Sequence, residues 1–126
     1  MKLLRLKGSK TEKDIRSQLV KSHESLFNDE MRSGLLSVIK TFFPQMKTAY
    51  ILYWTPEQGE DIFSLLINND TIASVEIDRY DSSIKPIIES RPLDNTYLEG
   101  LRRIPQITLA IALELADKDL KHDNQI

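Results

Sequence analysis

Residues 48–79 read TAYILYWTPEQGEDIFSLLINNDTIASVEIDR, and this stretch decides the fold. Segment 49–54 is rich in β-branched and aromatic residues, segment 56–59 has the composition of a turn, and segment 61–67 is again apolar. Segment 68–70 predicts a second tight turn, and 71–79 follows with apolar residues at every second position. The sequence therefore predicts a three-stranded antiparallel meander.

The alternation in the last of these strands predicts a sheet with one apolar and one acidic face. Ala73, Val75 and Ile77 alternate with Ser74, Glu76 and Asp78, and residues 49–81 contain seven acidic residues and one basic residue. Strict alternation in the first strand places two sets on opposite faces: Tyr50, Leu52 and Trp54 on one, Ala49, Ile51 and Tyr53 on the other. One aromatic set then needs cover outside a two-layer core, which an interface could provide.

Helical patterns precede the meander. Ser9 and Glu12 fit a capping box, and apolar residues recur at helical spacing after them. Asp29 interrupts this pattern and could cap a second helix, which Pro44 ends. Segment 9–43 is therefore either one bent helix or two, and we favour two.

The segments after the meander are less regular. Pro86 and Pro92 make 82–93 irregular, and the pattern leaves open whether it contains a short edge strand. Segment 94–120 is one helix or a pair kinked at Pro105, with 107–115 apolar enough to be buried. We expect a single α+β domain over 1–126, in which 1–8 is a flexible arm or short strand and 117–126 a charged tail.

Composition favours a cytoplasmic protein without a membrane partner. The 126 residues include no cysteine, so the chain has neither disulfides nor thiolate ligands. No apolar run approaches the ~20 residues that cross a bilayer. The net charge of −2 divides unevenly, because residues 1–48 carry ten basic and five acidic side chains whereas residues 49–126 carry seven and fourteen.

No catalytic apparatus is evident in the sequence. The four glycines are scattered, no serine lies in a nucleophile motif, and His23 is the one histidine within a predicted element, where we expect a solvated side chain. Glu76 and Asp78 could jointly ligate Mg²⁺ or Ca²⁺, yet two acids on one strand face are common. We expect no enzyme activity, no metal and no cofactor. We also expect no nucleic-acid partner, since an acidic sheet repels phosphates.

The order of two helices, a meander and a C-terminal helix, with an acidic strand face, resembles the small cytosolic immunity proteins of bacterial toxin–immunity pairs. The resemblance implies a protein that binds and blocks a toxic domain, often a basic nuclease, through acidic complementarity. Size, charge and the buried C-terminal helix also resemble dimeric secretion chaperones, which would make the chain a homodimer. The partner-binding residues expected on the immunity hypothesis are acidic and aromatic: Tyr53, Glu57, Glu60, Asp61, Asp70, Glu76, Asp78, Tyr80 and Asp81.

Overall fold

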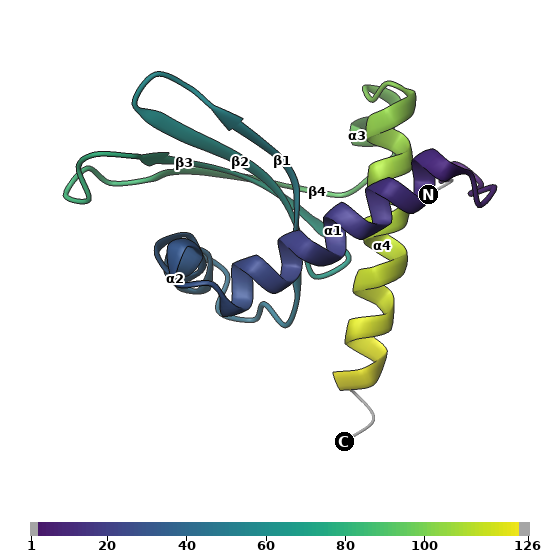
Figure 1. Cartoon of the computed structure of the whole chain (residues 1–126), viewed down its shortest axis with the longest axis horizontal. Coiled ribbons are helices and arrows are strands. Elements are labelled where there is room, and N and C mark those ends of the chain that lie inside the picture. Colours follow the sequence, from purple (N-terminus) through teal and green to yellow (C-terminus); the bar gives the residue numbers. More distant parts are fainter. Residues whose placement is uncertain (1–2, 124–126) are drawn as a thin grey trace.

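The computed structural model describes residues 3–123, without the side chains of Met31 and Asp123, and has four helices, a 3-10 turn and four strands (Figure 1). In chain order these are α1 (Lys10–Asn28), η1 (Glu30–Arg32), α2 (Ser33–Phe42), β1 (Ala49–Pro56), β2 (Glu60–Ile67), β3 (Thr71–Asp78), β4 (Ile87–Pro92), α3 (Asn95–Glu99) and α4 (Arg103–Asp123). The predicted α+β class is confirmed.

The N-terminal segment forms two helices, and its capping box is confirmed. The Ser9 hydroxyl accepts a hydrogen bond from the Glu12 amide, and the Glu12 carboxylate accepts one from the Ser9 amide. The prediction that Asp29 caps the second helix is wrong, because Asp29 is the C-cap of α1 and α2 begins only after η1. Residues 3–9 form neither helix nor strand, and Leu3 and Leu6 pack against the core.

The sheet is a meander of four strands in the order β1-β2-β3-β4, so the expectation of three strands was one too few. The undecided segment 82–93 supplies β4, which pairs antiparallel with β3 from Glu76↔Ile87 to Thr71↔Pro92. Pro92 is tolerated because β4 lies at the sheet edge, where one side of the strand needs no ladder partner.

A β-bulge at Leu52 changes which side chains of β1 share a face. The register shifts between Ile51 and Tyr53, so that Tyr53 pairs with Ser64. Since paired residues share a face, Tyr53 lies on the same face as Tyr50, and Trp54 lies on the opposite one. The assignment by strict alternation is therefore wrong beyond the bulge.

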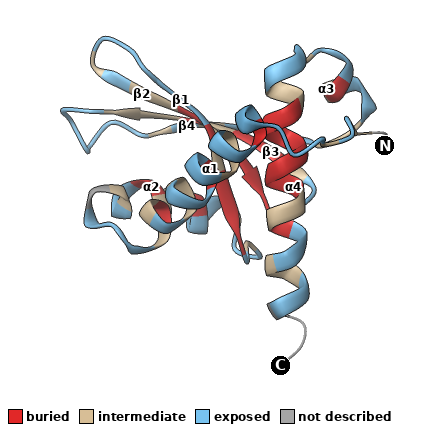
Figure 2. Ribbon diagram, turned by 45° about the vertical axis from the view of Figure 1, so that its right-hand side comes forward, coloured by how far each residue is buried: buried red, intermediate tan, exposed pale blue. Residues whose placement is uncertain are grey.

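Helices pack on both faces of the sheet at one end and on one face at the other. On the face that we call the α2 face, Phe63, Leu65 and Val75 pack with Leu26 of α1 and Ile39 of α2. On the opposite face, the α4 face, only the end bearing Tyr50, Leu66 and Ile72 is covered, by residues of α4 such as Ile111. Figure 2 shows burial concentrated where the strands meet α4 and fading toward the β1–β2 and β3–β4 connections.

The C-terminal segment forms two helices. Asp94 caps α3 by accepting a hydrogen bond from the Tyr97 amide, and Pro105 lies in the first turn of α4, where its missing amide hydrogen is not needed. Helix α4 extends to Asp123, through most of the segment expected to be a tail. Asp119 holds this part of α4 against β1, because its Oδ2 accepts hydrogen bonds from Tyr50 and Thr48.

Candidate protein-binding face

Helix α4 covers only one half of the α4 face, and the other half is uncovered by any described helix. Besides Asp78, whose carboxylate holds the turn after β3, register assigns nine residues to it, which we call the open half-face, and none of them is buried: Tyr53, Thr55, Glu60, Ile62, Ser64, Ser74, Glu76, Ile87 and Glu89. The set contains three carboxylates and no lysine or arginine.

The open half-face is arranged in rows that run across the strands. One row consists of Tyr53, Ser64, Ser74 and Glu89, and the next of Thr55, Ile62, Glu76 and Ile87. The first row has small side chains between an aromatic ring and a carboxylate.

The second row places the Glu76 side chain between two isoleucines, of which Ile87 is 58% exposed. Tyr53 in the first row is 40% exposed. A carboxylate bordered by exposed apolar groups is a surface that a partner can desolvate while it pairs with the charge.

The structure brings together some of the predicted site residues. Glu60, Glu76 and Tyr53 lie on the open half-face. Asp78 pairs with Glu60 at the end of β3, but its Oδ1 accepts hydrogen bonds from the Tyr80 and Asp81 amides, at 2.9 and 2.8 Å. Asp78 therefore stabilises the turn after β3.

The other predicted residues lie elsewhere. Glu57, Tyr80 and Asp81 are exposed in loops beyond the ends of the strands, where the Asp81 carboxylate accepts two hydrogen bonds from Ser83 that hold its pKa below the usual range. Asp70 lies in the β2–β3 turn, at the end of the sheet that α4 covers. Asp61 is next to Glu60 in β2 and therefore points to the α2 face.

Asp61 belongs to a polar cluster with aromatic neighbours on the α2 face. Its carboxylate accepts hydrogen bonds from Arg79, at 2.7 Å, and from the Trp54 indole, at 3.1 Å. The Arg79 hydrogen bond is the main reason that the pKa of Asp61 lies below its ordinary value. The Arg32 guanidinium lies 5.1 Å from the ring centroids of both Trp54 and Phe63.

A groove of about 410 Å³ runs beside this cluster, between α2 and the β3–β4 loop. Its apolar lining includes Leu35, Val38, Phe63, Ile77 and Ile84, and Asp61, Asp78 and Asp81 also border it. Each of these three carboxylates already accepts hydrogen bonds within the fold. These three carboxylates therefore contribute to the hydrogen bonding of the fold at the border of the groove.

His23 lies away from this groove and has a structural environment. Its Nδ1 is 2.9 Å from the Ala49 carbonyl oxygen, which can only accept, so Nδ1 carries the hydrogen. The ring stacks on Tyr50 and contacts Phe27, each at a centroid distance of 4.7 Å. The expectation of a solvated side chain was therefore wrong.

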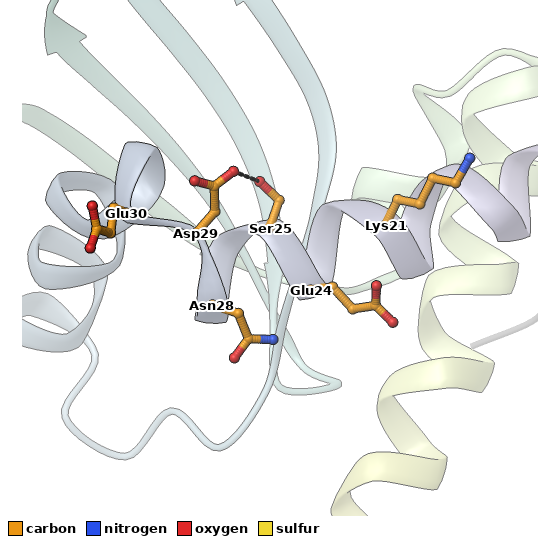
Figure 3. A pocket seen from close by; sticks show the side chains of 6 residues that line it. All are labelled: Lys21, Glu24, Ser25, Asn28, Asp29 and Glu30. Atoms are coloured by element: carbon orange, nitrogen blue, oxygen red, sulfur yellow. Dashed lines mark hydrogen bonds between the residues drawn. The ribbon is translucent and has the colours of Figure 1, made fainter.

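A second depression, of about 620 Å³, lies along α1 and η1 (Figure 3). Its side chains do not converge, since Glu24 and Asn28 point to one side of the helix and Ser25 and Asp29 to the other. Ser25 donates a hydrogen bond to Asp29 at 3.4 Å. This arrangement is that of a solvated helix surface.

The described residues contain no group of three or more histidine, aspartate or glutamate side chains placed to hold a metal ion. No helix among them combines the length and apolar content needed to cross a lipid bilayer. Comparisons with protein-family models, curated proteins and solved structures found no match to this chain.

Proposed function

We propose that this protein acts by binding another protein through the open half-face, as an immunity protein that neutralises a toxic domain with a basic surface. The observation that carries the proposal is the row of Ile62, Glu76 and Ile87, in which an acidic side chain is bordered by apolar ones on an uncovered sheet. Glu60 and Glu89 lie on the same face. Acidic groups of this kind steer a cationic partner to the surface and raise the association rate.

The partner that fits this face is a basic domain with apolar groups between its lysines and arginines. Asp61 forms an ion pair with Arg79, and Asp78 and Asp81 accept hydrogen bonds within turns. We therefore assign these three residues no part in recognition. We propose instead that Glu89 and Ile87 take part in recognition. These two residues lie near Glu76 only because β4 pairs with β3.

The experiment is co-expression of the tagged protein with the products of neighbouring genes, followed by binding kinetics with any basic polypeptide captured. The double variant Glu60→Lys/Glu76→Lys should reduce the association rate constant about tenfold and make it less sensitive to salt. The matched control is Asp70→Lys, a charge reversal at an exposed acid off the open half-face.

Equal binding by the double variant and the wild type would contradict the assignment of the open half-face. Failure to capture any basic polypeptide would contradict the immunity function itself. A dimeric secretion chaperone is the second candidate, and the exposed β4 edge favours it because a strand edge can take a second chain.

A further inference from the structure

The two edges of the sheet differ in how they are protected. Helix α1 runs along the β1 edge, with Leu19 in the α4-side core and Leu26 in the α2-side core, and His23 between them binds the Ala49 carbonyl. The bulge at Leu52 further disrupts this edge. The β4 edge is different, because five of its six residues are exposed.

The backbone of β4 presents hydrogen-bonding groups at alternate residues. The Leu93 amide donates to the Asp70 carbonyl at 2.9 Å, so Leu93 directs its backbone groups toward β3. In an antiparallel ladder this direction alternates from one residue to the next. The backbone amide and carbonyl groups of Ile88, Ser90 and Pro92 therefore point away from β3, toward solvent. Pro92 has no amide hydrogen, and it occupies an outward position where β3 requires none.

We propose that a second copy of this chain pairs with β4 in antiparallel fashion, with the two-fold axis at Ser90. The Ser90 amide of each copy then donates to the Ser90 carbonyl of the other. The Ile88 amide of each copy donates to the Pro92 carbonyl of the other, a bond for which proline is a competent acceptor. Glu89 lies directly opposite Arg91 of the second copy, in the type of pair in which side chains approach most closely.

Charge selects this register over its neighbours. Moving the axis by one residue to Glu89 sets Glu89 against Glu89 of the second copy, and moving it to Arg91 sets two arginines against each other. Moving it to Ile88 sets Arg91 against Lys85, and moving it to Pro92 centres the pair on a residue without an amide hydrogen. Among the registers centred on residues 88–92, the one centred on Ser90 combines reciprocal hydrogen bonds with opposite charges.

The pairing joins the two sheets edge to edge and, apart from Glu89, which lies opposite Arg91 of the second copy, leaves the open half-face of each copy uncovered. It does not depend on the proposed immunity function. The new contacts are few and exposed, so we expect a reversible dimer with a dissociation constant on the order of 100 µM. A short edge strand with proline and charged residues can instead protect a sheet from pairing, and this alternative predicts a monomer.

Sedimentation equilibrium from about 10 µM to about 1 mM tests the proposal. The average mass of the wild type should rise from the 14.6 kDa of the monomer toward twice that value. Ser90→Pro removes an outward amide hydrogen without altering the β3 ladder, and should raise the dissociation constant about tenfold or more. Glu24→Arg, at an exposed acid on α1, is the control that should associate like the wild type.

A mixing experiment tests the register. Glu89→Arg places two positive charges on each edge, Arg91→Glu places two negative charges, and each variant alone should stay monomeric. Their mixture should associate, because every cross-strand pair then joins opposite charges. Arg91 also lies 5.1 Å from the Tyr97 ring and 3.8 Å from Asp94, so circular dichroism must confirm that Arg91→Glu is folded.

Three results would overturn the proposal. The first is a wild type that remains at the monomer mass over the whole concentration range. The second is a wild-type dimer that Ser90→Pro leaves intact, which would place the interface elsewhere. The third is a mixture of folded charge variants that associates no more than either variant alone.

Discussion

Replacing Asp119 by alanine should lower the free energy of unfolding by about 3 kcal/mol, because two buried hydroxyl groups lose their acceptor. Asp119 Oδ2 lies 2.6 Å from the Tyr50 hydroxyl and 2.7 Å from Thr48 Oγ1. Tyr50 is 3% exposed and Thr48 1% exposed, so water has little access to either residue.

The magnitude follows from the two bonds. A hydrogen bond to a charged group contributes about 1.5–3 kcal/mol, and a buried donor left without an acceptor costs about 1–3 kcal/mol. We take the lower part of this range for each bond because Asp119 is itself partly exposed. For a domain of this size the loss corresponds to a fall in melting temperature of roughly 10 °C.

Urea unfolding followed by circular dichroism measures the effect. Asp117→Ala is the matched control, because Asp117 lies on the same helix, is exposed, and bonds only to the exposed Asn69 among the described residues. It should change stability by less than about 0.5 kcal/mol. A double-mutant cycle of Asp119→Ala with Tyr50→Phe should show coupling of about 1 kcal/mol or more.

An Asp119→Ala variant as stable as Asp117→Ala, or an additive double-mutant cycle, would contradict this prediction. Either result would mean that residues 117–123 contribute no more to stability than the charged tail that the sequence suggested. The cause would then be that the two hydroxyl groups exchange Asp119 for water at little cost.

Three further predictions concern a core side chain, stability at acidic pH and stability at alkaline pH. Ile39→Ala, in α2, removes a fully buried side chain and should cost about 3 kcal/mol in urea unfolding, whereas Lys40→Ala, at an exposed position on the same helix, should cost almost nothing. The pKa of Glu12 is held below 4.5, chiefly by the hydrogen bond from the Gly8 amide, so its stabilising effect is present above that pH and is lost as pH falls through the lowered pKa. The difference in melting temperature between the wild type and Glu12→Gln should therefore shrink on acidification, and a constant difference would contradict this account. Burial, followed by the Asp119 hydrogen bond, raises the pKa of Tyr50 above its usual 10, so the wild type should lose stability above pH 10 relative to Tyr50→Phe. Equal alkaline unfolding of the two proteins would refute that prediction.

Local signals account for the parts of the fold that the sequence predicted. The capping box at Ser9 needs residues only three apart, and the strands of the meander are joined by turns with clear composition. The alternation in β3 also identified Glu76 correctly as a residue of an uncovered face. Each of these features depends on residues close together in the chain.

Features that depend on distant residues were either missed or, as with a strand in 82–93, left open. Nothing near Asp119 indicates that it bonds to Tyr50, which lies 69 positions away. Pro86 and Pro92 argue against a strand by composition, and β4 exists because its position at the sheet edge tolerates Pro92. The bulge at Leu52 likewise reversed the faces of Tyr53 and Trp54 without a local signal.

One error in the candidate site was avoidable from the sequence. Glu60 and Asp61 are adjacent in a strand and must point to opposite faces, so they could not both belong to one acidic surface. The structure places Asp61 with Arg79 on the α2 face and Glu60 on the open half-face. The period of two, applied to β2, therefore assigns only one of these two acids to the open half-face.

The open half-face and the exposed β4 edge have a common origin in the placement of α4. Ile111 and its neighbours on this helix contact Tyr50, Leu66 and Ile72 at one end of the sheet. No described helix continues over the same face toward the β1–β2 and β3–β4 connections. The uncovered strands carry serine and glutamate there, which remain hydrated at little cost. Ile87 does not fit this pattern, since an exposed isoleucine beside Glu76 gains nothing from hydration. Its exposure is consistent with the proposal that another chain covers this face.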